Sequence, residues 1–225
     1  MNWRREDKEW LMMKCKGAIF DMDGLLFDTE KLFQQTWNEI AEERGIQLPK
    51  EFSGEISGTN GKHMCRVIEK YYKISDGREI QDECMLRVQA KLKRNVPKKP
   101  GVDEILQYFK KNKIPLAVAS SSSKQLIESN LRVARVSAYF DVIVSGTEVK
   151  HGKPAPDIFL IAAERIKCRP EECYVFEDSV NGVRAGVAAG CKTVMIPDLI
   201  LPTREEYKCC YGIYDTLKDA VMSFL

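Results

Sequence analysis

The sequence predicts an α/β fold in which a parallel β-sheet is covered by helices on both faces and is interrupted by an all-helical insertion. After residue 100, short apolar runs alternate with stretches of helical periodicity, which is the pattern of buried parallel strands joined by crossover helices. Between Thr29 and Pro97 the periodicity is helical throughout, and no run resembles a strand. A chain of 225 residues suits one large domain, or a core with a smaller inserted domain.

The first strand is predicted at Gly17–Phe20, an apolar run that ends at polar residues and a glycine. A helix is predicted at Glu30–Arg44, because apolar residues recur there at helical spacing until a glycine stops the pattern. The stretch Phe52–Gly61, rich in glycine and serine, is predicted to be a loop. Two polar helices are expected after this loop: Lys62–Tyr72 and Arg78–Asn95.

The breaker-rich stretch Pro97–Gly101 is predicted to be a linker, and a helix with a clear apolar face begins at Val102. Alternation of strands and helices resumes from there. Four more strands are expected, each with a continuously apolar run: Ile114–Ala119, Val142–Val144, Tyr174–Phe176 and Thr193–Ile196. The helices expected between them are Lys124–Val133, Pro156–Ile166 and Ser179–Ala189.

Composition excludes several classes of protein. Lysine and arginine (35) nearly balance aspartate and glutamate (33), so no overall field favours nucleic acid as a partner. No apolar segment has the length of a membrane span, and Met1–Lys14 has the character of a polar leader, not of a cleaved signal. The eight cysteines form no CxxC pair and the only histidines are His63 and His151, which disfavours disulfides and zinc. We therefore expect a cytoplasmic monomer with reduced thiols.

Two aspartates, Asp21 and Asp23, follow the first strand, and Gly24 comes directly after them. Open α/β sheets bind ligands at the carboxyl ends of their strands, and strand alternation directs both carboxylates to one face. Converging carboxylates repel each other unless they share a cation or a proton. Hard oxygen ligands in this arrangement favour a divalent metal.

Polar side chains also follow the later strands. Ser120 and Ser121 close the second strand, where a hydroxyl and the N–H groups of a helix start bind phosphate well. Lys153 comes after the third strand, and two nearby prolines restrict its backbone. Glu177 and Asp178 close the fourth strand. Taken singly, these features also fit a flexible loop, a solvated lysine and a helix N-cap.

The order Asp-x-Asp, Ser, Lys and Glu-Asp resembles the four signature motifs of the haloacid dehalogenase (HAD) superfamily, and it spans nearly the whole chain. The stretch Asp21–Thr29, with sequence DMDGLLFDT, resembles in particular the β-phosphoglucomutase-like phosphatase branch. This resemblance implies a Rossmann-like, doubly wound parallel sheet core with an inserted α-helical cap domain. The core would comprise residues 1–29 and 96–225, and the cap, which selects the substrate, residues 30–95.

The chemistry that the resemblance implies is hydrolysis of a phosphomonoester. Asp21 is the expected nucleophile, which forms an aspartyl-phosphate, and Asp23 the expected general acid and base. Several carboxylates and a phosphate in one cleft would repel each other, so a cation is required, and Mg²⁺ is the expected cofactor. The expected metal-binding residues are Asp21, Asp23 through its backbone carbonyl, Asp178, and Glu177 directly or through water. The groups expected to bind the transferring phosphoryl group are Ser120, Ser121 and Lys153.

The substrate is expected to be a small phosphorylated metabolite. By resemblance, Gly58, Asn60 and Lys62 of the cap would face the leaving group, with Arg87 as a further candidate. Small polar groups there suit a sugar or polyol phosphate, and a nucleotide or pseudouridine phosphate also stays open.

Two alternative functions stay open. The first is a phosphosugar mutase; such relatives carry a histidine twelve residues after the nucleophile, where this chain has Phe33, and an arginine that the cap loop Ile56–His63 lacks. Because a mutase must retain and re-present a phosphorylated intermediate, the loss of both groups favours hydrolysis. The second is a non-catalytic protein that binds a phosphorylated ligand, which is disfavoured because no motif residue is missing. Asp23 argues against dehalogenation, because dehalogenases of the superfamily usually lack it.

Overall fold

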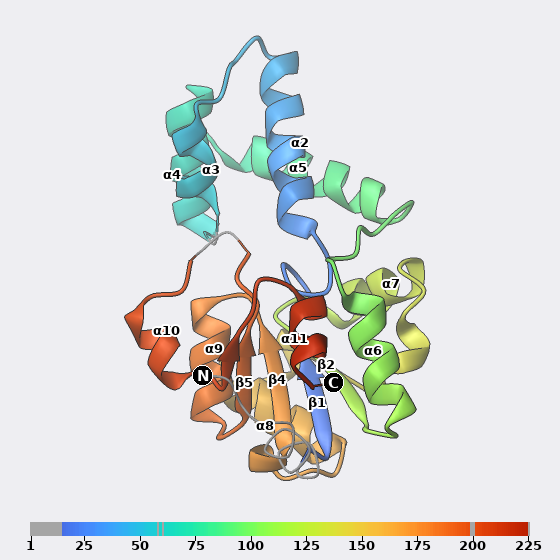
Figure 1. The fold of residues 1–225 in the computed structure, drawn as a ribbon. Helices are drawn as coiled ribbons and strands as arrows, with labels where there is room; N and C mark the ends of the chain where they lie inside the picture. Colours follow the sequence, from blue (N-terminus) through green and yellow to red (C-terminus); the bar gives the residue numbers. More distant parts are fainter. Residues whose placement is uncertain (1–14, 58, 60, 199–200, 225) are drawn as a thin grey trace. The chain divides into compact units, whose positions relative to one another are not determined.

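A computed structural model of the chain describes residues 15–57, 59, 61–198 and 201–224 (Figure 1). The predicted polar leader Met1–Lys14 lies outside these residues. The chain divides into two compact units. The helical unit comprises residues 28–96, and the core unit comprises the segments up to residue 27 and from residue 97 onwards. The sequence placed these divisions near residues 30 and 95, and the role of the helical unit as a substrate-selecting cap stays a prediction.

The core unit is built on a six-stranded sheet in which each neighbouring pair of strands is parallel. The strand order β3-β2-β1-β4-β5-β6 is that of a doubly wound, Rossmann-like sheet. The predicted fold class is therefore confirmed, with one strand more than the five expected. The strands are β1 (Gly17–Phe20), β2 (Leu116–Ser120), β3 (Val142–Ser145), β4 (Cys173–Glu177), β5 (Lys192–Met195) and β6 (Gly212–Ile213).

Helices connect these strands and cover the sheet. Those of the core unit are α6 (Val102–Lys111), α7 (Lys124–Val133), α8 (Asp157–Arg165), α9 (Val180–Ala188), α10 (Arg204–Cys209) and α11 (Leu217–Phe224). Three short 3₁₀ segments join them: Ser137–Tyr139, Gly146–Glu148 and Pro170–Glu172.

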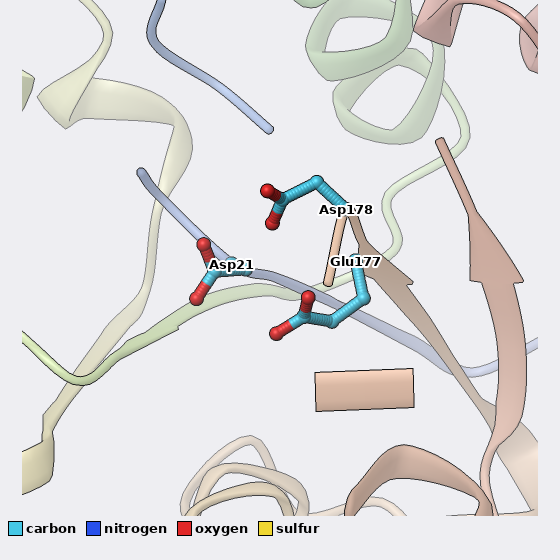
Figure 2. A group of neighbouring side chains, drawn as sticks. All are labelled: Asp21, Glu177 and Asp178. Carbon is cyan, nitrogen blue, oxygen red and sulfur yellow. The ribbon is translucent and has the colours of Figure 1, made fainter. Parts of the chain in front are cut away.

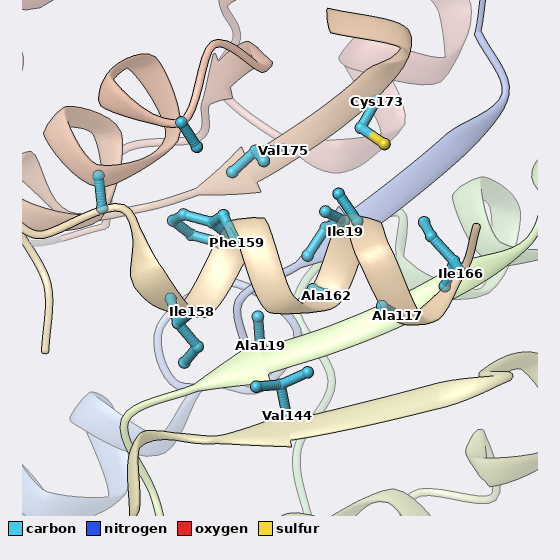
Figure 3. Close-up of a cluster of buried hydrophobic side chains, with 13 residues drawn as sticks. Ile19, Ala117, Ala119, Val144, Ile158, Phe159, Ala162, Ile166, Cys173 and Val175 are labelled. Carbon is cyan, nitrogen blue, oxygen red and sulfur yellow. The ribbon is translucent and has the colours of Figure 1, made fainter. Parts of the chain in front are cut away.

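Apolar side chains cover both faces of the sheet, which explains why its strands are continuously apolar in sequence. On one face, Ile19 and Val175 pack against α8 in a buried cluster (Figure 3). Strand alternation sends Phe20 and Phe176 to the other face, where their rings stack with centroids 4.7 Å apart. There Phe109 of α6 contacts both rings edge-on, at 6.0 and 5.8 Å. The core therefore fixes β1 and β4 side by side.

The described residues of the helical unit form four helices: α2 (Thr29–Glu43), α3 (Lys50–Ile56), α4 (Gly61–Tyr72) and α5 (Arg78–Leu92). An aromatic cluster holds α2, α3 and α4 together. The ring of Phe52 contacts Trp37 and Tyr72 edge-on, with centroids 6.3 and 6.1 Å away. The Tyr72 hydroxyl donates a 2.6 Å hydrogen bond to the backbone carbonyl of Trp37.

The loop predicted at Phe52–Gly61 is wrong over its first five residues, which belong to α3. Phe52 and Ile56 lie four residues apart on one helix face, and both are buried. Their packing outweighs the low helix propensity of Ser53 and Gly54.

Candidate active site

The strand register brings the first and fourth sequence motifs together. Phe20 of β1 pairs with Phe176 of β4, so the next residues, Asp21 and Glu177, lie side by side at the carboxyl edge of the sheet. The backbone N–H of Asp21 continues this pairing with a 3.0 Å hydrogen bond to the carbonyl of Phe176. In a doubly wound sheet this edge, where the chain path reverses between β1 and β4, is the usual place of a ligand site.

Three carboxylates, those of Asp21, Glu177 and Asp178, point toward one another at this edge (Figure 2). Each offers an oxygen, and these oxygens all lie within 4.8 Å of one another. Burial raises the pKa of Asp21, although Lys153 opposes the shift, and burial together with the charges of Glu177 and Asp21 raises the pKa of Asp178. Ionised carboxylates at this spacing favour a bound cation, and an all-oxygen donor set is hard and fits Mg²⁺.

The ammonium group of Lys153 binds two of these carboxylates. Its Nζ donates to Oδ1 of Asp21 at 2.5 Å and to Oε1 of Glu177 at 2.6 Å. The side chain of Lys153 is only 8% exposed. Burial by itself would lower the pKa of Lys153, but the two carboxylates outweigh it and raise the pKa, which keeps the ammonium charged. The structure thus brings the predicted lysine directly to the predicted nucleophile.

Glu177 is held from its other side by the start of α9. Its Oε2 accepts hydrogen bonds from the backbone N–H and the hydroxyl of Ser179, at 2.9 and 3.0 Å. A Cβ at Gly182 would overlap the Glu177 carboxylate, so a side chain at position 182 would displace that carboxylate. Both oxygens of Glu177 therefore have protein donors.

Asp23 directs its carboxylate toward the serines that follow β2. Its Oδ2 accepts a 2.9 Å hydrogen bond from the Ser122 hydroxyl and a longer one, 3.4 Å, from that of Ser120. Ser120 is buried and also accepts the Ser122 N–H, whereas Ser121 is exposed. Sequence reasoning chose the first two serines of the run and missed Ser122. The four-serine run was the available signal, but it does not tell which hydroxyl faces Asp23.

The expected substrate-binding residues of the helical unit are placed only in part. Lys62 is exposed and lines an open cavity of about 550 Å³ between α4 and the start of α5. Gly58 and Asn60 lie outside the described residues. The guanidinium of Arg87 binds two glutamates of the same unit, which supports a structural role for it instead of a role at the leaving group.

The eight cysteines form no disulfide in the structure, and their reduced state stays a prediction. In the part of the chain that the structure describes, none of the helices combines the length and the apolar character needed to cross a bilayer. The monomeric state and the cytoplasmic location stay predictions.

Comparison with known proteins identifies the class to which this fold and site belong. Residues 18–196 match the family model of haloacid dehalogenase-like hydrolases. A probable pseudouridine-5′-phosphatase of Drosophila melanogaster is 35% identical over 196 residues, which cover 84% of each chain. A phosphorylated carbohydrates phosphatase of Thermotoga maritima is 35% identical over 184 residues, 80% of this chain and 83% of that one.

The crystal structure of a putative β-phosphoglucomutase from Thermotoga maritima is similar in fold, with a TM-score of 0.80 and 28% identity, and covers 93% of this chain and 100% of that one. The chain belongs to the haloacid dehalogenase-like hydrolases. The family and the enzyme class predicted from the sequence, a phosphoric monoester hydrolase, are therefore confirmed.

Proposed function

We propose that this protein is a Mg²⁺-dependent phosphatase that hydrolyses a small phosphomonoester through an aspartyl-phosphate on Asp21. One observation carries the proposal: Asp21, Glu177 and Asp178 converge with a buried Lys153 where two adjacent strands end. The site combines a carboxylate nucleophile, a cation-binding group of oxygens and a fixed positive charge. These are the parts that phosphoryl transfer requires.

The residues of the site support a proposal for how the cation would be held. Asp21 and Asp178 would be carboxylate ligands, together with the backbone carbonyl of Asp23. Glu177, whose oxygens already accept hydrogen bonds from Lys153 and Ser179, would contribute through water. When bound, Mg²⁺ would neutralise these carboxylates and the phosphate oxygens, which would otherwise repel each other.

The chain's own side chains then carry the two displacement steps. An oxygen of Asp21 attacks phosphorus and forms the aspartyl-phosphate, while the bond to the leaving-group oxygen breaks and that oxygen takes a proton from Asp23. In the second step Asp23 takes a proton from water, the water oxygen attacks phosphorus, and the aspartyl bond breaks. This releases inorganic phosphate and restores both carboxyl groups. Ser122 would keep the carboxyl of Asp23 oriented, and Lys153 would stabilise the charge of the transferring group.

The names of two relatives support a proposal for the substrate class. The named relatives are a phosphatase of phosphorylated carbohydrates and a probable phosphatase of pseudouridine 5′-phosphate. We therefore propose a sugar phosphate or a similar small metabolite as the substrate. A phosphosugar mutase is the second candidate, because the similar crystal structure is described as a putative β-phosphoglucomutase. Phe33, at the position of the histidine expected in mutases, favours hydrolysis.

The test measures release of inorganic phosphate from p-nitrophenyl phosphate and from a panel of sugar phosphates. Asp21→Asn should reduce release to the uncatalysed background while circular dichroism shows a folded chain. Asp103→Asn, the same chemical change in an exposed ion pair with Lys98, should leave release unchanged. EDTA should abolish the activity of the unaltered protein and added Mg²⁺ should restore it.

Full activity of Asp21→Asn would refute the assignment of Asp21 as the nucleophile. Activity that survives EDTA would refute the requirement for a metal ion. A sugar 1-phosphate that yields its isomer instead of inorganic phosphate would establish the mutase.

A further inference from the structure

A partly buried ion pair lies beside the candidate metal ligands and has no role in the chemistry described above. Nζ of Lys99, in the linker before α6, lies 2.7 Å from Oδ1 of Asp198, which follows β5. The two side chains are only 17% and 11% exposed. The backbone N–H of Lys99 also donates to the carbonyl of Leu26, at 2.9 Å, which ties the linker to the loop after β1. Lys99 is thus held by the backbone, and it in turn holds one oxygen of Asp198.

The other oxygen of Asp198 has a different environment. Oδ2 is buried and finds no hydrogen-bond partner among the residues that the structure describes. A buried acceptor without a donor lowers the free energy of unfolding by about 1–3 kcal/mol. Such an acceptor therefore indicates that a water, an ion or a ligand supplies the missing partner. The direction in which this oxygen faces therefore indicates what supplies the donor.

The surroundings of Gly24 show the direction in which Oδ2 of Asp198 points. A Cβ added at Gly24 would overlap Oδ2 of Asp178 and would lie 3.3 Å from Oδ2 of Asp198. The two oxygens therefore flank the same point and are separated by no more than two hydrogen-bond lengths, each about 2.8 Å. A water placed between the two carboxylates would donate a hydrogen bond to each. Asp178 is a candidate metal ligand, and bound Mg²⁺ usually keeps several waters.

We propose that Asp198, held in place by Lys99, is a positioning residue of the magnesium site that accepts a hydrogen bond from the hydration shell of the cation beside Asp178. This inference rests on the proposed function, because it requires that the carboxylates bind Mg²⁺. Lys99 fixes the carboxylate so that its free oxygen faces the site. Partners of this kind orient the ligands and the waters of a metal site.

The test is the affinity for Mg²⁺ alone, measured by isothermal titration calorimetry without substrate. In Asp198→Asn the carbonyl oxygen of the amide stays with Lys99, so its NH₂ group takes the place of Oδ2 and presents a donor where an acceptor is needed. We expect the dissociation constant for Mg²⁺ to rise about 10- to 100-fold. Asp103→Asn, in the exposed pair with Lys98, is the matched control and should leave the constant unchanged.

Lys99→Met separates positioning from the effect of charge. If Asp198 acts only through its negative charge, removal of the neighbouring positive charge should tighten Mg²⁺ binding. If Lys99 positions Asp198, Lys99→Met should weaken binding, whereas Lys98→Met should not. Thermal unfolding without metal reports whether each variant is folded, and Lys99→Met, which keeps the Asp198 carboxylate, decides the question if Asp198→Asn does not fold.

The outcomes are distinct. Weaker Mg²⁺ binding in both variants supports the inference. Unchanged binding in Asp198→Asn, or tighter binding in Lys99→Met, overturns the inference and leaves the proposed function intact. A failure of the unaltered protein to bind Mg²⁺ overturns the metal role in the proposed function, and this inference with it.

Discussion

Replacement of Lys153 by methionine tests how far a single buried ammonium stabilises the core unit. The side chain of Lys153 is 8% exposed, and those of its partners Asp21 and Glu177 are 9% and 1% exposed. Methionine fills most of the same volume but carries no charge, so the change leaves two buried carboxylates without their cation. Such a change costs far more than the loss of an ion pair in water.

The magnitude follows from the burial of the pair. Removal of one partner from a buried ion pair typically costs about 3–5 kcal/mol of unfolding free energy. In a chain of this size each kcal/mol lowers the melting temperature by about 2–4 °C, so we expect a fall of roughly 6–20 °C. Lys98→Met breaks an exposed pair, in which the two side chains are 33% and 48% exposed, and should cost less than about 1 kcal/mol.

The assay is urea unfolding followed by circular dichroism in the presence of EDTA. The same substitution is also made in an Asp21→Asn background, where one of the two buried charges is absent. In the Asp21→Asn background, Lys153→Met should lower the free energy of unfolding by a smaller amount, because only the Glu177 carboxylate loses its partner. Suppose instead that Lys153→Met lowers the free energy of unfolding by no more than Lys98→Met does. That result would show that solvent screens the charges of Lys153, Asp21 and Glu177, and it would refute the predicted role of burial.

Three further predictions concern other parts of the chain. Gly182→Ala should lower phosphatase activity at least about tenfold, because the added Cβ displaces the Glu177 carboxylate from Lys153. The control is Gly54→Ala, whose Cβ meets nothing within 4 Å and which should leave the activity unchanged. Tyr72→Phe removes the hydrogen bond to Trp37 and should lower the stability of the helical unit by about 0.5–1.5 kcal/mol, seen in urea unfolding followed by tryptophan fluorescence; no loss would show that the bond contributes nothing. Hydrogen bonds from Arg169 and Lys16 lower the pKa of Glu172 from 4.5 to about 2, so Glu172 stabilises the fold above its ordinary pKa and loses this effect as the pH falls toward 2. The melting temperature of Glu172→Gln should therefore fall below that of the unaltered protein near pH 6 and approach it in acid, and a gap that widens in acid would contradict this assignment.

Much of the core unit could be predicted from sequence because its strands are buried on both faces. Gly17–Phe20 was predicted at the observed bounds of β1, and Lys124–Val133 at those of α7. In a parallel sheet all carboxyl ends meet at one edge, so a polar residue that ends an apolar run is already placed near the others. This is why Asp21 and Glu177 could be named together, although more than a hundred residues separate them. Lys153 lies in the loop beyond β3, and its place at the site was predicted from the family resemblance.

The elements that escaped prediction lack such a local signal. The strand β6 has only two residues, both half-buried, and neither continuous apolarity nor alternation can appear over that length. Helix α3 forms because two side chains pack into the helical unit, and this packing overrides its serine and glycine. The pair of Lys99 and Asp198 joins residues 99 positions apart, so only the folded chain reveals it.

The packing that stabilises the core also creates the electrostatic problem at the site. The stacked rings of Phe20 and Phe176 fix the register of β1 against β4, and that register sets Asp21 beside Glu177 at the next position. Any slip that separated the two carboxylates would also expose the apolar faces of both strands, so the chain cannot relieve the repulsion by moving apart. The repulsion is relieved by positive charge or by a shared proton at the same edge. Lys153 supplies one positive charge, and the carboxylate of Asp178, close to both, adds a further negative group that the proposed Mg²⁺ would neutralise. The sheet register thus places the carboxylates that would bind the divalent cation proposed above, and that cation would in turn favour a phosphate at the same edge.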